Sequence, residues 1–228
     1  MPIRWGIAGP GGIAERFASS MADVEGGEIV AVASRSAERA DAFADRFDIP
    51  QRYGSYEDLA AADLDVVYVA TTQQRHRDDV LLYVGAGKHV LCEKPMTMNA
   101  AQTTEVVAAA RAARVFLMEA IWSRFLPYRR VVLDALGSGR IGDPLLVEAD
   151  FGFALPVDVE HRLFDPGRGG GALLGLGVYP VELCAAVLGH PTTVDGRGWI
   201  GETGVDETVA AVLGHGDGRF GVVKASIT

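Results

Sequence analysis

Residues 3–14 read Ile-Arg-Trp-Gly-Ile-Ala-Gly-Pro-Gly-Gly-Ile-Ala, a short apolar run that passes directly into a glycine turn. The apolar run predicts a buried strand over 3–8, and the residues after the turn predict a helix that begins at Gly12. A strand, a glycine turn and a helix in this order predict the first unit of a doubly wound α/β domain.

The small residues of this turn form the pattern Gly-x-Gly-x-x-Ala at Gly9, Gly11 and Ala14. Gly9 permits the tight turn, Gly11 lets the backbone approach a pyrophosphate, and Ala14 allows the helix to pack closely on the strand. The N-terminus of the helix then faces the anion. The motif therefore predicts a dinucleotide site, and the alternative is a glycine turn in an α/β protein that binds no nucleotide.

The end of the second predicted strand, 28–33, bears on the choice of dinucleotide. An NAD site usually places an acidic residue here, whereas this chain has Ser34 and Arg35. A hydroxyl and a guanidinium suit a 2′-phosphate, and Arg39, one helical turn later, adds a second positive charge. The pattern favours NADP over NAD, and the alternative is a solvated loop with ordinary surface arginines.

Short apolar runs continue to alternate with helical patterns over the first 120 residues, which predicts a parallel sheet covered by helices on both faces. After about Trp122 strands follow one another, so we expect a dinucleotide-binding domain over 1–120 and an α+β domain over 121–228. The last predicted strand, 218–227, ends with no covering segment after it, and we expect it to leave an open sheet edge. The other predicted elements are strands at 66–70, 89–92, 115–119, 144–155, 192–201 and 207–214, and helices at 37–47, 77–86, 99–113 and 170–188.

Composition excludes several classes of protein. Hydrophobic residues make up 49% and charged residues 22% of the 228 residues, which is typical of a globular protein. The formal net charge of −9 argues against nucleic acid or an anionic membrane as the main partner. Cys92 and Cys184 are far apart, so neither a disulfide framework nor a metal site is predicted. Without a signal peptide or membrane-spanning pattern, we expect a cytoplasmic protein.

A lysine follows the strand predicted at 89–92, within the triplet Glu93-Lys94-Pro95. This position puts Lys94 at the carboxyl edge of the sheet, where open α/β folds bind ligands. A partly desolvated lysine near a nicotinamide can polarise a carbonyl or exchange a proton during hydride transfer. A lone lysine is more often a surface residue, which is the alternative here.

Together with the segments Met118–Pro127 and Gly169–Leu174, these motifs resemble the glucose-fructose oxidoreductase, inositol dehydrogenase and MocA (Gfo/Idh/MocA) family. The resemblance covers nearly the whole chain and is greatest to the branch that contains dihydrodiol dehydrogenase and NADP-dependent xylose dehydrogenase. It implies a Rossmann domain followed by an open, mainly antiparallel sheet that covers the nicotinamide and forms a homodimer interface. It also implies NADP-dependent hydride transfer to or from a sugar or cyclic diol.

The resemblance implies that Lys94 is catalytic and that Tyr179 is an acid or base, whereas a core tyrosine is the alternative for Tyr179. The candidate dinucleotide-binding residues come from the glycine turn, the strand ends and the domain junction: Gly9, Gly11, Gly12, Ile13, Ala14, Ser34, Arg35, Arg39, Thr71, Thr72, His76, Glu93, Lys94, Trp122 and Arg124.

The chain departs from the family pattern in three places. Gly175 stands where the family normally has aspartate, four residues before Tyr179, and this spacing would place both on one helical face. Thr72-Gln73-Gln74 stands where the family usually has proline followed by asparagine or histidine, and family members continue beyond Thr228. We therefore keep two alternatives to an active enzyme: an NADP-binding protein with impaired or no catalysis, and a shortened form of an active enzyme.

Two further aromatic residues, Phe151 and Phe153, lie two apart on one predicted strand and so share a sheet face. They could line a pocket, but we expect a core or dimer-face position and leave them out of the catalytic set.

Overall fold

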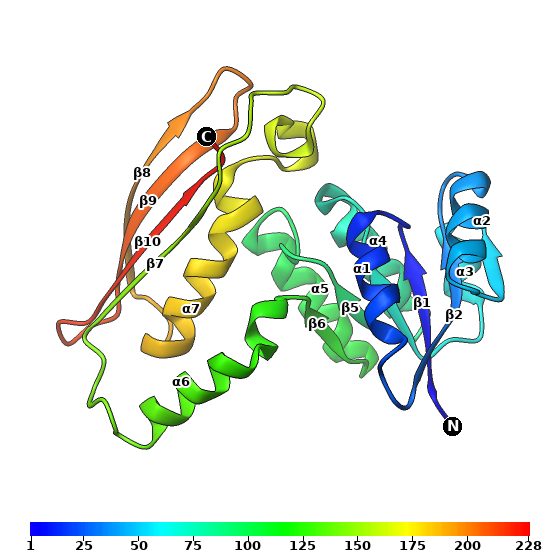
Figure 1. The fold of residues 1–228 in the computed structure, drawn as a ribbon, viewed down its shortest axis with the longest axis horizontal. Helices are drawn as coiled ribbons and strands as arrows, with labels where there is room; N and C mark the ends of the chain where they lie inside the picture. Colours follow the sequence, from blue (N-terminus) through cyan, green and yellow to red (C-terminus); the bar gives the residue numbers. More distant parts are fainter. The chain divides into compact units, whose positions relative to one another are not determined.

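The computed structural model describes residues 1–228, which form two compact units, Met1–Ala120 and Ile121–Thr228 (Figure 1). Unit 1 has the strands β1 (Ile3–Ala8), β2 (Gly27–Ala33), β3 (Gln51–Tyr53), β4 (Val66–Val69), β5 (His89–Cys92) and β6 (Leu117–Glu119). Its helices are α1 (Gly12–Met21), α2 (Ala37–Arg46), α3 (Tyr56–Ala61), α4 (His76–Gly85) and α5 (Ala100–Ala113).

The six strands of unit 1 form one sheet in the order β3-β2-β1-β4-β5-β6, and every neighbouring pair is parallel. The chain reverses its direction of travel across the sheet between β1 and β4. Doubly wound folds bind ligands beyond the carboxyl ends of the strands at such a reversal. The predicted Rossmann architecture is therefore confirmed, and its expected binding edge is the one that carries the glycine turn.

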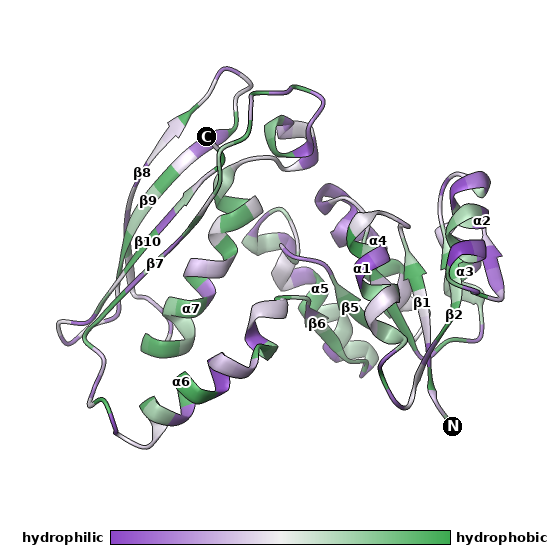
Figure 2. Cartoon of the chain, in the orientation of Figure 1, coloured by the Kyte–Doolittle hydropathy of each residue, from purple (hydrophilic) through white to green (hydrophobic).

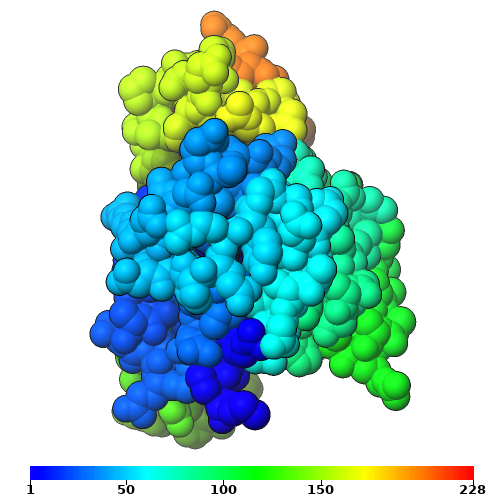
Figure 3. Space-filling view, turned by 90° about the vertical axis from the view of Figure 1, so that its right-hand side faces the viewer, coloured from blue at the N-terminus to red at the C-terminus, as the bar shows by residue number.

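Helices cover both faces of this sheet, and each face has its own core. One core joins the strands to α1 and α2 and includes Ile7, Ala14 and Phe43, while the other joins them to α3, α4 and α5 and includes Leu59 and Tyr83. Strands buried on both faces are expected to be continuously apolar, and the central strand β4, which reads Val-Val-Tyr-Val, has this pattern. Figure 3 shows the end of unit 1 formed by α2, β3 and α3, in light blue to cyan.

Unit 2 contains a four-stranded mixed sheet in the order β7-β10-β9-β8. The β8–β9 and β9–β10 pairs are antiparallel and the β10–β7 pair is parallel, so the expectation of a mainly antiparallel sheet is confirmed. Its strands are β7 (Leu146–Gly152), β8 (Thr193–Ile200), β9 (Asp206–Gly214) and β10 (Phe220–Ser226). Its helices are α6 (Pro127–Gly137) and α7 (Val178–Leu188), with a short 3₁₀ turn at Trp122–Phe125 and a π-helical turn at Leu173–Gly177 directly before α7.

One expectation about this sheet is wrong. The last strand, β10, does not lie at an open edge, because it pairs with β9 on one side and with β7 on the other. The edges are β7 and β8. The β9–β10 pair is local, whereas β7 lies far back in the sequence, and the sequence pattern carries no signal for that parallel pairing.

Helix α7 covers one face of this sheet and is largely hydrophobic (Figure 2). Cys184 on α7 packs with Leu213 of β9 and Val223 of β10, and all three are buried. The helical stretch Pro166–Leu188 is long and apolar enough to cross a membrane by length and composition alone, and 44% of its most apolar window is buried inside the protein. A helix that packs in the core of a soluble protein can have the same length and apolar composition.

His215 follows β9 and gives a first prediction. The ring is only 5% exposed, and neither of its nitrogens has a hydrogen-bond partner. A buried polar group without a partner costs about 1–3 kcal/mol, so His215→Leu is expected to raise the free energy of unfolding by about 1 kcal/mol in chemical denaturation. His190→Leu, at an exposed position, is the control and should change it by less than about 0.5 kcal/mol. A clear loss of stability in His215→Leu would show that the imidazole has a partner.

Candidate functional site

The glycine turn after β1 has a backbone that admits only glycine at its first position. Gly9 has a φ of +91°, in the region that side chains disfavour. A Cβ built there would lie 2.9 Å from the carbonyl oxygen of Ala70, at the end of β4. The turn therefore passes against the neighbouring strand end, with no room for a side chain between them.

The next glycines have open space instead of a neighbour. A Cβ at Gly11 or Gly12 would meet nothing within 4 Å. Gly11 is the N-cap of α1, and no side chain caps this helix, so its first amides are available to a ligand. Ala14 is fully buried, as close packing of α1 on the sheet requires, and Ile13 is 41% exposed beside the turn. The space in front of the first amides of α1 is open because Gly11 has no side chain, and this space fits a pyrophosphate. A Cβ at Gly11 would fill it.

The end of β2 carries the residues predicted to distinguish NADP from NAD. Ser34 is buried, and its hydroxyl accepts a hydrogen bond of 3.2 Å from the amide of Ser36. Arg35 is exposed, whereas the Arg39 guanidinium donates to the carbonyl of Pro10 at 3.0 Å. Both arginines are exposed. Arg39 contacts the glycine turn itself, whereas Arg35 lies at the strand end.

Lys94 lies two residues beyond the end of β5, and the residue before it is firmly held. The Glu93 carboxylate accepts from the Tyr68 hydroxyl at 2.5 Å and from the Lys94 amide at 3.1 Å. Lys94 itself is half-buried. Burial raises the pKa of the neighbouring Cys92 thiol well above its usual range, and the carboxylates of Glu93 and Glu119 raise it further. Cys92 is therefore a protonated, unreactive thiol at this edge of the sheet.

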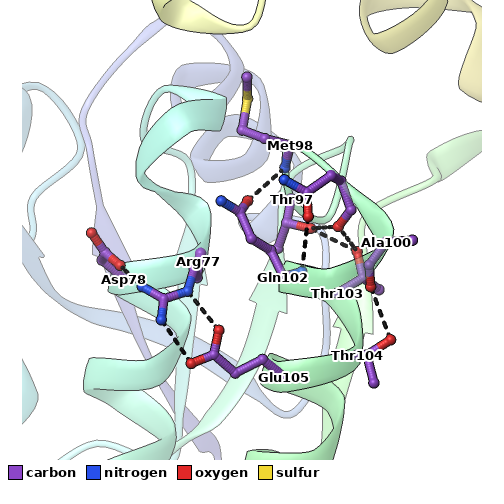
Figure 4. Close-up of polar contacts among 10 residues, drawn as sticks. Arg77, Asp78, Thr97, Met98, Ala100, Gln102, Thr103, Thr104 and Glu105 are labelled. Carbon is purple, nitrogen blue, oxygen red and sulfur yellow. Dashed lines mark hydrogen bonds and ion pairs between the residues drawn. The ribbon is translucent and has the colours of Figure 1, made fainter.

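The segment after Pro95 is anchored to β6 and α5. The amide of Met96 donates to Glu119 at 2.7 Å, and the amide of Met98 donates to Gln102 at 3.1 Å. Figure 4 shows the Met98–Gln102 bond together with the contact between the hydroxyls of Thr97 and Thr103. The loop that follows Lys94 is therefore fixed at several points in succession.

Figure 4 also shows how α4 and α5 are joined. Arg77 on α4 donates two hydrogen bonds of 2.7 Å to the Glu105 carboxylate on α5 and one of 2.7 Å to Asp78. A bidentate pair of this kind has a fixed geometry. Helix α4, which begins beside the end of β4, is thus held against the helix that follows the Lys94 loop.

Three predicted site residues follow β4, Thr71 and Thr72 in the loop and His76 at the start of α4, and the structure places them differently. Thr72 is exposed, whereas the Thr71 hydroxyl donates to the buried carboxylate of Asp79 at 2.7 Å. The His76 ring is 1% exposed and lies between two backbone carbonyls, those of Thr71 and Pro95. His76 is thus an interior residue rather than a surface one. Sequence reasoning missed Asp79, although its spacing of three from His76 on α4 was a readable signal.

Unit 2 has a pocket of about 370 Å³, and Tyr179 lies in its wall. The Trp122 indole donates to the Tyr179 hydroxyl oxygen at 2.8 Å, and the ring of Phe151 meets the Tyr179 ring edge-on at 5.4 Å. The pocket lining is mostly apolar and aromatic and includes Tyr128 and Val132 of α6. Phe151 lines this pocket and is 40% exposed, so the core position expected for it is wrong and the pocket position kept as the alternative is the one observed.

A buried ion pair beside this pocket was also missed. Arg129 on α6 makes two hydrogen bonds of 2.6 Å to the Glu182 carboxylate on α7. Arg124, predicted to bind the dinucleotide, lies 3.4 Å from the same carboxylate. Glu182 is three residues after Tyr179 and therefore near it on the surface of α7. The pair joins α6 to the helix that carries Tyr179.

Removing one member of this pair is expected to destabilise unit 2 strongly. The Arg129 and Glu182 side chains are 7% and 12% exposed, so Arg129→Met leaves a carboxylate buried without its main partner. A loss of about 3–5 kcal/mol in the free energy of unfolding follows, and Arg129→Met combined with Glu182→Leu should recover a large part of it. The exposed pair Lys224–Glu148 is the control, since Lys224→Met should cost less than about 1 kcal/mol. Equal small losses at both pairs would contradict this account.

Gly175 lies inside the π-helical turn and is buried. A Cβ at this position would come within 2.6 Å of Cδ2 of Leu163, which is itself 2% exposed. A π-helical turn is wider than an α-helical one, so a spacing of four does not align residues 175 and 179 as it would in a regular helix. An aspartate at 175 would require Leu163 to move.

Comparisons with known proteins agree with this description. The family described as "Oxidoreductase family, NAD-binding Rossmann fold" matches residues 3–121, and the "GFO/IDH/MocA C-terminal domain" matches residues 130–228. The trans-1,2-dihydrobenzene-1,2-diol dehydrogenase of Mus musculus is 44% identical over 235 residues, which cover 100% of this chain and 69% of that protein. Its counterpart from Homo sapiens is 41% identical over 233 residues, with the same two coverages.

A solved structure supports the same assignment. A 3-ketoreductase from Actinomadura kijaniata, in complex with NADP and TDP-benzene, superposes with a TM-score of 0.89 at 30% identity and covers 100% of this chain and 70% of its own. The chain therefore belongs to the Gfo/Idh/MocA family of NAD(P)-dependent oxidoreductases.

Proposed function

We propose that this chain oxidises a hydroxyl group of a cyclic diol with NADP as the hydride acceptor. The observation that carries the substrate class is the pocket beside Tyr179, whose walls are aromatic and aliphatic with few polar groups. A flat, largely apolar ring with two hydroxyls suits such walls better than a sugar with a hydroxyl on almost every carbon. The relatives named as dihydrobenzene-diol dehydrogenases support this choice.

NADP is proposed over NAD because of the end of β2. No carboxylate follows this strand directly, and Ser34 is followed by the exposed Arg35. A guanidinium forms strong, charge-assisted hydrogen bonds to a phosphate, whereas an acid at this position would repel it. The 3-ketoreductase that this chain resembles was solved with NADP. Arg39 contributes by holding the glycine turn through Pro10.

Lys94 and Tyr179 are proposed to handle the proton. When bound, the nicotinamide accepts the hydride that leaves the alcohol carbon. The hydroxyl proton must then leave as the C–O bond becomes a carbonyl, and an amine or a phenol can accept or relay it. Because Trp122 donates to the Tyr179 oxygen, the Tyr179 hydroxyl hydrogen points away from Trp122. The aromatic contacts of Tyr179 fix the orientation of its ring.

A homodimer through the sheet of unit 2 and a cytoplasmic location complete the proposal. The side of this sheet opposite α7 exposes Leu146, Val212 and Phe220, which are 63%, 41% and 47% exposed, respectively. Cross-strand pairing sets Phe220 directly beside Leu146. An exposed apolar patch on a sheet face suits a second copy of the chain.

The two free, buried cysteines suit a reducing compartment.

An NADP-binding protein without turnover is the second candidate, because Gly175 lacks the family's carboxylate. A steady-state assay of NADP⁺ reduction distinguishes the two, with trans-1,2-dihydrobenzene-1,2-diol and xylose as alternative substrates. We expect turnover with the diol and a kcat/KM at least about tenfold lower with the sugar. If the wild type is inactive with both, Gly175→Asp is tested together with Leu163→Val, which makes room for the new side chain. Activity that appears only in the double variant would establish the second candidate.

A further inference from the structure

The interior histidine of α4 has a role that its sequence position did not indicate. Both ring nitrogens of His76 contact main-chain carbonyls, Nδ1 that of Pro95 at 2.8 Å and Nε2 that of Thr71 at 3.1 Å. Thr71 lies just after β4, and Pro95 directly follows Lys94 after β5. One ring therefore spans two neighbouring strand ends at the edge of the sheet where the glycine turn lies.

The two contacts differ from ordinary helix or sheet bonds because they link separate loops. Both partners are carbonyl acceptors, so the neutral ring donates to one of them and the imidazolium donates to both. With 1% exposure, His76 is shielded from bulk water. A buried side chain in this position sets the distance between the two loops.

Asp79, three residues after His76 on α4, strengthens the first of these attachments. Its carboxylate is fully buried, accepts from the Thr71 hydroxyl at 2.7 Å and pairs with Arg75 at 2.7 Å. Thr71 is thus held through its hydroxyl by Asp79 and through its carbonyl by His76. The start of α4 is fixed to the end of β4, and the His76 ring extends from this fixed point to the loop after β5.

We propose that His76 positions Lys94 by fixing the carbonyl of Pro95. The proposal rests on the proposed function, in which Lys94 handles the proton. Glu93 is already held by Tyr68 and Met96 by Glu119, so the residues on both sides of Lys94 and Pro95 have side-chain anchors on the sheet. His76 supplies the anchor at Pro95 itself. Both of its ring nitrogens contact main-chain carbonyls, so we propose a positioning role for His76 in place of the dinucleotide contact expected from the sequence. Its loss should move or loosen Lys94 while leaving the glycine turn and Arg35 unchanged.

The chain has three lysines, so the proposed positioning of Lys94 by His76 can be tested without an activity assay. Lys88, Lys94 and Lys224 are the only lysines, so competitive labelling of amines followed by mass spectrometry reports all three in one sample. In His76→Phe, which keeps a ring but has no nitrogen, we expect the labelling rate of Lys94 to rise by about threefold or more relative to Lys88 and Lys224. His76→Gln, which retains one amide donor, should give a smaller rise and provides a second folded variant.

Val80→Ala is the matched control. Val80 is fully buried on the same helix and belongs to the apolar core, so its truncation should lower the melting temperature by creating a cavity. It should leave the relative labelling of Lys94 unchanged. If Val80→Ala raises Lys94 labelling as much as His76→Phe does at a similar loss of stability, His76 has a general packing role and the proposal is overturned.

Steady-state kinetics give the second measurement. Misplacement of a reacting group by about 1 Å can cost about 100-fold in rate, so kcat of His76→Phe is expected to fall about 10- to 100-fold. The KM for NADP should change by less than about threefold, because the glycine turn and Arg35 are untouched. Unchanged Lys94 labelling in both folded His76 variants would overturn the proposal. Full turnover in Lys94→Ala would instead overturn the proposed function, while the labelling result would still decide the role of His76.

Discussion

Replacing Gly11 with valine is expected to abolish dinucleotide binding while leaving the fold of unit 1 intact. A Cβ at Gly11 meets no atom within 4 Å, and its backbone, with φ near −118°, is one that any residue adopts. The melting temperature should therefore change little. The new side chain occupies the space in front of the first amides of α1, where the pyrophosphate is expected. We expect the dissociation constant for NADP to rise by at least about 100-fold, which corresponds to a loss of about 2.7 kcal/mol.

Gly9→Ala in the same turn is expected to act mainly on stability, in contrast to Gly11→Val, which is expected to act on NADP binding. The positive φ costs about 1–2 kcal/mol for a residue with a Cβ, and the 2.9 Å approach to the Ala70 carbonyl adds overlap with backbone that cannot move freely. A loss of about 2–4 kcal/mol in the free energy of unfolding should follow. Gly87→Ala is the control that separates the cost of a positive φ from the cost of steric overlap. Gly87 has a φ of +73°, but a Cβ there would meet nothing within 4 Å. If Gly11→Val binds NADP as tightly as the wild type, the glycine turn is not the phosphate site.

Lys94→Ala is expected to lower kcat by about 10²–10⁴-fold, the usual contribution of a positioned acid or base. The pyrophosphate and the 2′-phosphate are proposed to bind at the glycine turn and at Arg35, so NADP affinity should stay within about threefold of the wild type. Lys88→Ala is a matched control at the opposite end of β5. Its ammonium donates to the carbonyls of Ala62 and Leu64, so this variant should lose stability but not turnover. A kcat within about threefold of the wild type in Lys94→Ala would remove this residue from the mechanism.

The elements that could be predicted from sequence are those whose burial determines the local pattern. β1 and β5 are apolar because helices cover both faces of the sheet, and their predicted ranges agree with the structure. β3 and α3 were missed because three and six residues are too short to show a period. α6 was missed because its neighbouring apolar residues Val131, Val132 and Leu133 are all exposed and do not follow the pattern of a helix with one buried face.

For the candidate site, local backbone geometry could be predicted and tertiary contacts could not. The conformation of Gly9 could be predicted because a glycine in a strand-to-helix turn usually indicates a positive φ. The positions of His76 and Arg129 depend on partners 19 and 53 residues away in the sequence, and no local pattern specifies those partners. The same limit applies to Gly175, where the nearest side chain, Leu163, comes from a separate loop.

The most direct test of the central claim is a calorimetric titration of the wild-type chain with NADP⁺ and, separately, with NAD⁺. The account predicts that NADP⁺ binds with a dissociation constant of about 1 μM or lower, near −8 kcal/mol, and that NAD⁺ binds at least about tenfold more weakly. Arg35→Asp should reverse this order, because it exchanges the cation for the acid that an NAD site carries. Failure of both dinucleotides to bind at tens of micromolar, or tighter binding of NAD⁺ by the wild type, would contradict the account.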